Sequence, residues 1–421
     1  MVKRIAIIGS GISGLAAGYL LSRRHEVHLF EREPRLGGHT HTVIVESSTG
    51  PIALDTGFLV HNDRTYPNLV RLFAEIGVET QPSDMSFSVS CPQTGFEYSS
   101  RGARGFFAQK KNLVRASHWR LLASIARFNR RAPAMLDDHE AMSVTLGEFL
   151  DGERYGEAFA ERYLYPMASA IWSASIDAIR SFPVMTLVRF FDNHGLLAMD
   201  GHVPWKAVRG GSHTYIPLLT APYRDRVSTG VTIRTVERDE AGVTLQFAAL
   251  PDARPAARFD EVVFACHGNQ VLPLLAEPRE IERDILGRFE TARNEAWLHT
   301  DESVLPRRSA ARASWNYRLG DAPDAPPTVS YHLNRLQSLS TPEQYSVTLN
   351  PRGLVTERLV LRKMVYHHPQ YTLDAIRAQA RWSEVSGVNR THFCGAYWFY
   401  GFHEDGLMSA IRVARALGVT W

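Results

Sequence analysis

Histidine is the side chain best suited to proton transfer and metal binding near neutral pH. Two histidines, His39 and His41, follow a pair of glycines in the stretch RLGGHTHTV. A zinc site needs further ligands at short, regular spacing, and none follows this pair. The pair therefore predicts part of a ligand cradle and no metal site. Other candidates for proton donation are His61, His299, His367 and His368, although a lone histidine is more often structural than catalytic.

The length and composition indicate what kind of protein carries these residues. The chain has 421 residues, of which 44% are hydrophobic and 22% charged, which is typical of a globular protein of two or three domain-sized units. Cys91, Cys266 and Cys394 are odd in number and far apart, so a disulfide framework is not expected. No apolar run reaches the length of a membrane span. We expect a cytoplasmic enzyme.

The N-terminal residues predict a nucleotide-binding strand, turn and helix. Arg4 to Ile8 reads as a buried parallel strand, a glycine-rich turn follows, and a helix is expected from Ser13 to about Arg23. The turn has the spacing G-x-G-x-x-G, with Gly9, Gly11 and Gly14 at the glycine positions. Such a turn lets the backbone approach a pyrophosphate at the positive end of the helix.

A second apolar strand, 27–30, completes this pattern. It ends at Glu31, which lies where a carboxylate accepts the ribose hydroxyls of an adenosine. Together these features predict a bound dinucleotide. After Glu31 the chain brings in Gly37 and Gly38, then Asp55-Thr56-Gly57, so further backbone segments are expected to run along a long cofactor.

These motifs resemble the flavin-containing amine oxidase superfamily, which also includes phytoene-type desaturases, protoporphyrinogen oxidase and fatty-acid double-bond isomerases. The resemblance extends to the hairpin around Val236 and to the stretch THFCGAYWFYGFHEDGLMSA near the C-terminus. It implies that FAD is the cofactor. A strand is then expected to end at Gly395-Ala396, with a helix starting near Gly406-Leu407 under the flavin ring, where its dipole would stabilise reduced flavin.

The cofactor-binding residues predicted in this way come from both ends and the middle of the chain. They are Gly9, Gly11, Ile12, Ser13, Gly14, Glu31, Arg32, Gly37, Gly38, His39, Thr40, Thr56, Gly57, Val236, Gly395, Asp405, Gly406 and Leu407. The catalytic candidates are His61, His368, Tyr397 and Tyr400, and none of them forms a recognisable dyad.

The predicted fold is α/β, with a doubly wound parallel sheet of Rossmann type assembled from separate segments. We expect residues 1–75, 206–285 and 385–421 to form the FAD-binding domain. Residues 76–205 and 286–384 then form an interleaved α+β substrate domain with a helical cap.

A basic segment, 101–131, stands out within the cap. No acidic residue occurs between Glu97 and Asp137, and the apolar residues of 121–128 follow helical spacing. Two interpretations fit: an ordinary cap helix with a solvated basic face, or peripheral docking on the anionic inner face of a membrane. The segment carries nine cations: Arg101, Arg104, Lys110, Lys111, Arg115, Arg120, Arg127, Arg130 and Arg131. No nucleic-acid recognition motif accompanies them.

Two departures from the amine oxidase pattern guide the prediction of activity. His39 stands where amine oxidases commonly carry an arginine, and no lysine occurs between Lys206 and Lys363, where those enzymes commonly carry the lysine that positions a water at flavin N5. We therefore expect an FAD-dependent oxidoreductase that takes hydride from a lipid, desaturating or isomerising an unsaturated acyl chain that can be part of a phospholipid. The sequence leaves the electron acceptor unknown.

Two alternatives remain at this point. One is a flavin amine oxidase acting on a small amine, with Tyr397 and Tyr400 walling the substrate. The other is a membrane-associated flavoprotein with a redox-sensing or scaffolding role. A carboxylate-rich pocket would favour an amine, whereas an apolar tunnel beside the flavin would favour an acyl chain.

Overall fold

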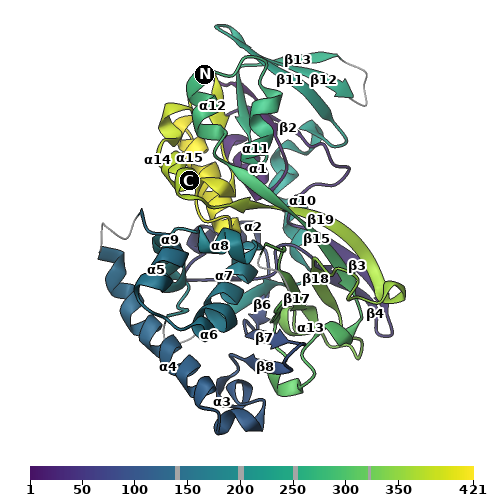
Figure 1. Cartoon of the computed structure of the whole chain (residues 1–421). Helices are drawn as coiled ribbons and strands as arrows, with labels where there is room; N and C mark the ends of the chain where they lie inside the picture. The colour runs from purple at the N-terminus through teal and green to yellow at the C-terminus, as the bar shows by residue number, and fades with distance from the viewer. Residues whose placement is uncertain (138–142, 198–202, 250–254, 321–323) are drawn as a thin grey trace.

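A computed structural model describes residues 1–137, 143–197, 203–249, 255–320 and 324–421. The chain forms two parts that share one junction (Figure 1). Both termini lie in the upper part, and the helices of residues 102–193 lie in the lower part. The α/β fold class predicted from the sequence is confirmed, whereas the residue boundaries between the two units stay a prediction.

A parallel sheet forms the centre of the upper part. Four of its strands come from three distant stretches of the chain, and the fifth, β10, is a short edge strand. In spatial order they are β10 (Val227–Ser228), β2 (Glu26–Phe30), β1 (Arg4–Ile8), β14 (Glu261–Phe264) and β20 (Thr391–Phe393). Every neighbouring pair is parallel. The central strand β1 is almost continuously apolar because both of its faces are covered.

Helices and a small antiparallel sheet cover the parallel sheet. Helix α1 (Ile12–Leu21) follows β1 directly and packs beside α15 (His403–Ala416). A three-stranded meander lies beside the parallel sheet, formed by β11 (Thr232–Asp239), β12 (Gly242–Ala249) and β13 (Ala256–Phe259). One hydrophobic core joins β1, α1, the meander and α15, which ties the two ends of the chain together.

The lower part is built on a mixed seven-stranded sheet. Its order is β19 (Val360–Gln370), β15 (Glu290–His299), β18 (Ser346–Leu349), β17 (Thr328–His332), β16 (Trp315–Arg318), β7 (Phe87–Cys91) and β8 (Phe96–Ser99). The long strands β15 and β19 run from the junction along the edge of this part (Figure 1). A second hydrophobic core lies between this sheet and the cap helices.

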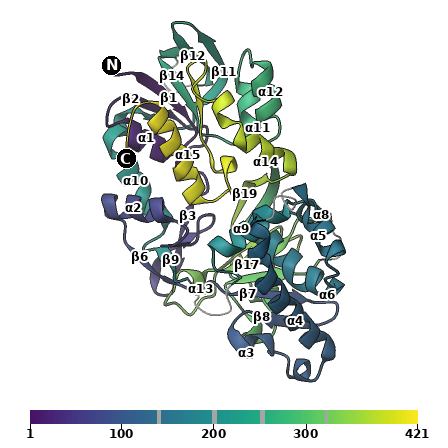
Figure 2. The same ribbon diagram turned by 90° about the vertical axis from the view of Figure 1, so that its left-hand side faces the viewer.

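The cap helices gather on one side of the mixed sheet, as Figure 2 shows. They are α3 (Gly102–Phe106), α4 (Ala116–Arg131), α5 (Leu146–Gly152), α6 (Glu157–Phe159), α7 (Tyr165–Trp172), α8 (Ile176–Arg180) and α9 (Val184–Asn193). In the described part of the chain, none of the helices is both long enough and apolar enough to cross a membrane.

Smaller elements join the two parts. The hairpin β3 (Thr42–Ser47) and β4 (Gly50–Asp55) follows the predicted cradle, and β5 (His61–Asn62), β6 (Thr80–Ser83) and β9 (Trp205–Val208) form a three-stranded sheet. Helix α2 (Pro67–Ile76) follows β5 and packs against α15. Its N-terminus is capped by the carboxylate of Glu404, which accepts the backbone N–H of Leu69 at 2.9 Å.

Two local predictions are wrong in their boundaries. The C-terminal helix begins at His403 rather than near Gly406, because the side chain of Asp405 accepts the backbone N–H of Phe402 and extends the helix by one turn. The preceding strand ends at Phe393, two residues earlier than expected. The aromatic run that follows begins with a 3-10 turn, Ala396–Trp398.

Candidate functional site

A single cavity of about 1120 Å³ extends from the turn after β1 into the lower part of the molecule. Its wall combines the glycine-rich turn, the end of β2, the segment 38–41, the segment 56–60, the middle of β19 and the turn 395–397. Pockets for drug-sized ligands measure roughly 300–1,000 Å³, so this cavity has room for more than one small ligand.

At one end of the cavity, a carboxylate faces the turn after β1. Oε2 of Glu31 accepts hydrogen bonds from the backbone N of Ser10 at 2.9 Å and from its hydroxyl at 2.6 Å. Oε1 accepts the backbone N–H of Glu33 at 2.9 Å. These charge-assisted bonds fix the carboxylate at the C-terminal end of β2, where it can also accept ribose hydroxyls.

The glycine-rich turn is closed by backbone packing. A Cβ atom on Gly14 would lie 1.9 Å from the carbonyl oxygen of Gly9, so only glycine lets α1 start this close to β1. The first turn of α1 holds no acidic side chain. Its free backbone N–H groups therefore present a positive helix end to the cavity.

A second backbone segment runs beside this turn. The amide of Gly37 donates to the carbonyl oxygen of Ser10 at 3.0 Å, and the guanidinium of Arg35 donates to the carbonyl oxygen of Gly38 at 2.9 Å. A Cβ atom on Gly57 would lie 2.2 Å from the carbonyl oxygen of His39, so the segment 56–58 passes directly behind the cradle. The glycine-rich turn 9–14, the segment 35–39 and the segment 56–58 thus converge on one wall of the cavity.

Four aromatic rings form a cluster on this wall. They belong to His39 of the cradle, to His267 after β14, and to Tyr366 and His368 of β19. The ring of His39 stacks on Tyr366 at 4.9 Å and lies 5.3 Å from the ring of His368 and 6.1 Å from that of His267. Nε2 of His39 is buried without a partner in the described structure. Burial lowers the pKa of His39 well below its usual value and lowers the pKa of His267 and of His368 to about 4. The three imidazoles are therefore neutral at pH 7.

His41 has a different environment from His39. Its Nδ1 lies 2.9 Å from the hydroxyl of Tyr366, which also bonds Thr56 Oγ1 at 2.7 Å. In the part of the chain that the structure describes, no group of His, Cys, Asp and Glu side chains is arranged to hold a metal ion.

The other end of the cradle is formed by the start of α15. The ring of His403 stacks on Phe58 at 3.8 Å, and its Nε2 lies 3.1 Å from Thr40 Oγ1 and 3.1 Å from the hydroxyl of Tyr215. Burial lowers the pKa of His403 to about 3. The positive end of α15 therefore meets the cavity beside a neutral imidazole.

Most of the predicted cofactor residues line the cavity. They are Gly9, Gly11, Ile12, Ser13, Glu31, Arg32, Gly38, His39, Thr56, Gly57 and Gly395. Those that the cavity wall does not include are Gly14, Gly37, Thr40, Val236, Asp405, Gly406 and Leu407. Gly14, Gly37 and Thr40 support the wall from behind through the contacts described above.

The remaining four positions also lie off the cavity wall, and their roles at FAD stay predictions. Val236 is fully buried, and its carbonyl oxygen accepts the amide of Ala276 at 3.1 Å, so the wall near the meander is formed by residues 231–233 instead. Asp405 caps its own helix, and burial raises the pKa of its carboxyl to about 7. Gly406 faces Ile12 of α1, and Leu407 is fully buried in the core. These residues hold α15 in place.

The catalytic candidates divide in the same way. His61 lies in the core between Phe58 and Phe73 and is absent from the cavity wall, so the structure does not support it. His368, Tyr397 and Tyr400 line the cavity. Nδ1 of His368 is bonded to Asn294 at 2.9 Å, and the Tyr397 ring packs against Phe289 and Trp398.

Sequence reasoning missed four residues of the cradle wall: Arg35, His267, Tyr366 and His403. Arg35 opens the stretch RLGGHTHTV, two residues before the predicted Gly37, so its position already pointed to it. His403 lies in the C-terminal stretch that carries the family resemblance, whereas His267 and Tyr366 come from other segments of the chain.

The far half of the cavity is apolar. Residues of β7, α7, α9, β9 and β16 to β19 line it, together with the loops beside them. They bring thioether, aliphatic and aromatic side chains together. They include Leu59, Val60, Met85, Phe87, Met167, Ile171, Trp172, Phe190, Leu196, Trp205, Trp315, Tyr331, Leu349 and Met364. Among the described residues on the whole wall, Glu31 and Glu33 are the only carboxylates, and both belong to the opposite end.

The tertiary structure is similar to several solved flavoenzymes. A single-residue variant of putrescine oxidase superimposes with a TM-score of 0.70 at 15% identity, covering 99% of both chains. A putative protoporphyrinogen oxidase from Exiguobacterium sp. 255-15 gives 0.69 at 16% identity over 99% of both chains. A fatty acid isomerase from P. acnes that produces CLA gives 0.67 at 16% identity over 98% of both. At these identities the likeness shows the fold.

Sequence comparison supplies the family. A curated relative, an uncharacterized protein of Methanocaldococcus jannaschii, is 60% identical over 35 residues, which span 8% of this chain and 9% of that protein. Residues 12–331 match the family described as flavin containing amine oxidoreductase. The cradle residues fit FAD, since Glu31 would accept its ribose hydroxyls and the N-terminus of α1, which has no acidic side chain in its first turn, would face its diphosphate. The chain therefore belongs to the flavin-containing amine oxidoreductase family and is an FAD-dependent oxidoreductase.

Proposed function

We propose that this protein oxidises or isomerises an unsaturated acyl chain that enters the apolar half of the cavity. The single observation that carries the proposal is the composition of that half. Its wall is built mainly from aliphatic, thioether and aromatic side chains, with Ser86, Ser173 and His194 among them, and the described residues place no carboxylate there. An ammonium ion buried among these side chains would lack a partner, which costs several kcal/mol.

An acyl chain is complementary to this wall. Each buried methylene group contributes about 0.8 kcal/mol, so a chain of ordinary length gains enough to be held without a charged anchor. The fatty acid isomerase among the similar structures supports this class of substrate, and the amine oxidases among them support the alternative. The missing carboxylate favours the acyl chain.

FAD, when bound, supplies an acceptor for the hydride of an activated C–H bond. The task of the protein is to align that bond and to exclude water. Ile171 of α7 and Met364 of β19 line the apolar half, and the neutral histidines close the other side of the cradle. No group on the wall needs to act as a strong base for this chemistry.

The test mixes the FAD-loaded protein, without oxygen, with vesicles of linoleoyl phosphatidylcholine, with free linoleic acid, and separately with putrescine. Flavin absorption and the acyl chains, analysed by mass spectrometry, are followed together because an isomerisation leaves the flavin oxidised at the end. We expect a new acyl product from one of the two lipid forms. Flavin bleaching with putrescine and no acyl product would show an amine oxidase.

A pair of variants connects the activity to the apolar half. Ile171→Phe fills part of the cavity and is expected to reduce acyl turnover at least tenfold while leaving FAD binding unchanged. Ile376→Phe is the matched control, because Ile376 of α14 (Leu373–Ala380) packs against the same core but does not line the cavity. Unchanged chemistry in both variants, or chemistry with neither substrate, would contradict the proposal.

A further inference from the structure

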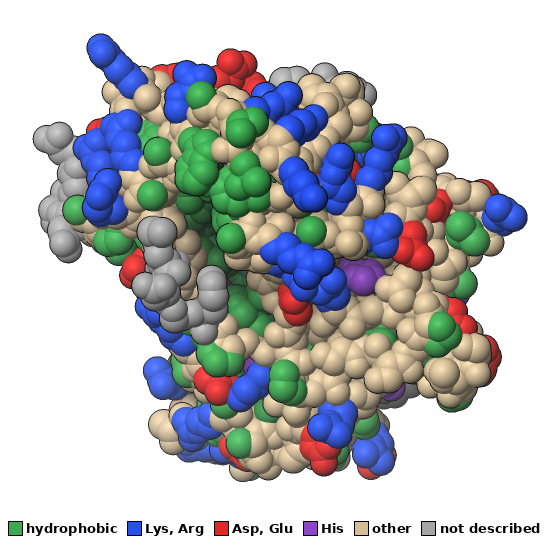
Figure 3. Space-filling model, turned by 90° about the horizontal axis from the view of Figure 1, so that it is seen from below, with side chains coloured by type: hydrophobic (Ala, Val, Ile, Leu, Met, Phe, Trp, Pro, Cys, Tyr) green, Lys and Arg blue, Asp and Glu red, His purple; other side chains and the backbone are tan. Residues whose placement is uncertain are grey.

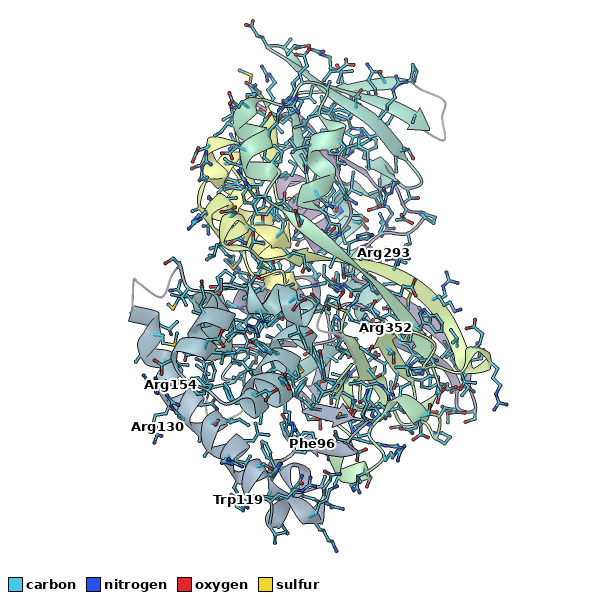
Figure 4. All side chains as sticks on the ribbon, in the orientation of Figure 1. Phe96, Trp119, Arg130, Arg154, Arg293 and Arg352 are labelled. Atoms are coloured by element: carbon cyan, nitrogen blue, oxygen red, sulfur yellow. The ribbon has the colours of Figure 1, made fainter. Side chains whose placement is uncertain are left out.

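An exposed apolar corner lies at the lower end of the molecule, where the chain passes from α3 to α4. Leu113 is 52% exposed, Val114 87% and Trp119 51%, although they lie within seven residues of one another. Figure 4 shows Trp119 at the lower end of α4. Apolar side chains that gather on a surface in this way mark a site of interaction.

The corner is held in a fixed shape by its own contacts. The indole N–H of Trp119 donates to the carbonyl oxygen of Leu113 at 2.9 Å, which ties the helix to the preceding turn. The Trp119 ring packs on Phe107 at 5.2 Å, and Phe107 packs on His118 at 5.5 Å. The exposed side chains are therefore presented by an ordered scaffold.

The rest of α4 faces the protein. Leu121 is 3% exposed and Phe128 is fully buried in the core of the cap. The apolar stripe of α4 therefore packs in the cap, as in the first of the two interpretations of the basic segment. What remains available for a partner is the turn before α4 and its first residues.

Cations surround the exposed apolar side chains. Lys110, Lys111, Arg115 and Arg120 are exposed, and the ion pairs between described residues include none of them. By contrast, Arg127 and Arg131, near the other end of α4, both pair with Glu153. Figure 3 shows the lower face of the molecule with apolar side chains among many Lys and Arg side chains.

We propose that this corner, Leu113, Val114 and Trp119 with Lys110, Lys111, Arg115 and Arg120, docks the protein on an anionic lipid bilayer. Cations that surround apolar and indole side chains match the headgroup region, where phosphates lie above the first methylene groups. A second copy of the chain would bring cations against cations. The argument uses surface residues alone and does not rest on the identity of the substrate.

The experiment measures flotation of the full FAD-loaded chain with vesicles of phosphatidylcholine alone and of equal parts phosphatidylcholine and phosphatidylglycerol. We expect binding to the anionic vesicles only, and release as the salt concentration rises. Each cation near such a surface contributes about 1 kcal/mol, so Lys111→Glu should lower the partition coefficient about tenfold or more.

Two matched controls keep the test specific. Arg130→Glu makes the same charge change on α4, about 16 Å along the helix from Trp119, and should lower partitioning much less. Val114→Ser should lower it severalfold, whereas Leu361→Ser, at a side chain of β19 that is 45% exposed, should not.

Four results would overturn the proposal, of which the first three concern vesicle type and charge. These three are equal binding to both vesicle types, no binding at all, and an equal loss in Lys111→Glu and Arg130→Glu. The fourth result is weaker partitioning of Lys111→Glu with unchanged partitioning of Val114→Ser. It would mean that the cations act without insertion of apolar side chains, as they would on an acidic protein surface. Since binding is measured without turnover, these results are independent of those on acyl chemistry.

Discussion

The carboxylate of Asp55 accepts hydrogen bonds from both the backbone amide and the hydroxyl of Ser212, each at 2.8 Å to Oδ1. Thr42 Oγ1 donates to the same oxygen at 2.5 Å. Asp55 ends β4 and leads directly into Thr56 and Gly57 on the cavity wall, whereas Ser212 follows the glycine pair after β9. One buried carboxylate thus joins two distant segments behind the cradle.

Replacement of Asp55 should destabilise the protein in a pH-dependent way. Asp55→Ala leaves the donors of Ser212 and Thr42 unpaired and should cost about 3 kcal/mol or more, and Asp55→Asn less because it keeps an acceptor. Burial raises the pKa of Asp55 to about 6. The part of the folding stability that comes from this raised pKa is therefore present in full below pH about 4 and is lost as the pH rises through 6.

The measurement is urea unfolding of the wild-type protein and Asp55→Asn at several pH values. The stability advantage of the wild-type protein should shrink between pH about 4 and 7. An advantage that grows over this range would show that the carboxylate is stabilised as an anion and would contradict the prediction.

Loss of charge at Glu31 should weaken FAD binding. Glu31→Gln keeps the size of the side chain but replaces charge-assisted bonds with neutral ones, so we expect the dissociation constant to rise about tenfold. Glu290→Gln is the control, since Glu290 at the start of β15 is exposed and does not line the cavity. Quenching of FAD fluorescence by the deflavinated proteins measures both constants, and equal effects would refute the role of Glu31.

The neutral histidines should make the flavin-free protein sensitive to acid. Their pKa values are lowered from about 6.5 in the unfolded chain, so the folded state loses stability as pH falls from about 6.5 towards 4. His267→Gln should reduce the fall in Tm between neutral pH and about pH 5. His213→Gln, at an exposed histidine, should leave that fall unchanged, and the same reduction in both variants would argue against the cluster.

Lys363 should play no part in the oxidation of reduced flavin. Its Nζ pairs with Glu357 at 2.5 Å and lies over the ring of Trp297, and its side chain is 47% exposed. Lys363→Met, reduced by light and then mixed with air, should reoxidise at the wild-type rate. Slower reoxidation in the variant would place this amine at the flavin.

The sequence predicted those parts of the site that depend on local backbone. The turn Gly9–Gly14, the carboxylate at the end of β2 and the segment 37–39 follow each other closely, and their spacing alone sets their geometry. Contacts between distant residues were not predictable. Thr40 meets His403, and Asp55 meets Ser212, only because of tertiary packing, and neither pair has a spacing that indicates it.

The basic segment shows the same limit. Helical spacing of Leu121 and Phe128 indicated an apolar face, but spacing cannot say whether that face meets the core or the outside. The structure turns it towards the core and leaves Val114 and Trp119 outside, because the cap helices need that face to close their own core.

The cradle and the apolar half are parts of one undivided cavity, and β19 contributes Met364 to one half and Tyr366 and His368 to the other. Anything that shifts this strand acts on both ligands at once. By thermodynamic linkage, the factor by which bound FAD changes the affinity for the substrate equals the factor by which the substrate changes the affinity for FAD. A substrate that moves β19 would therefore also change how firmly the protein retains its cofactor.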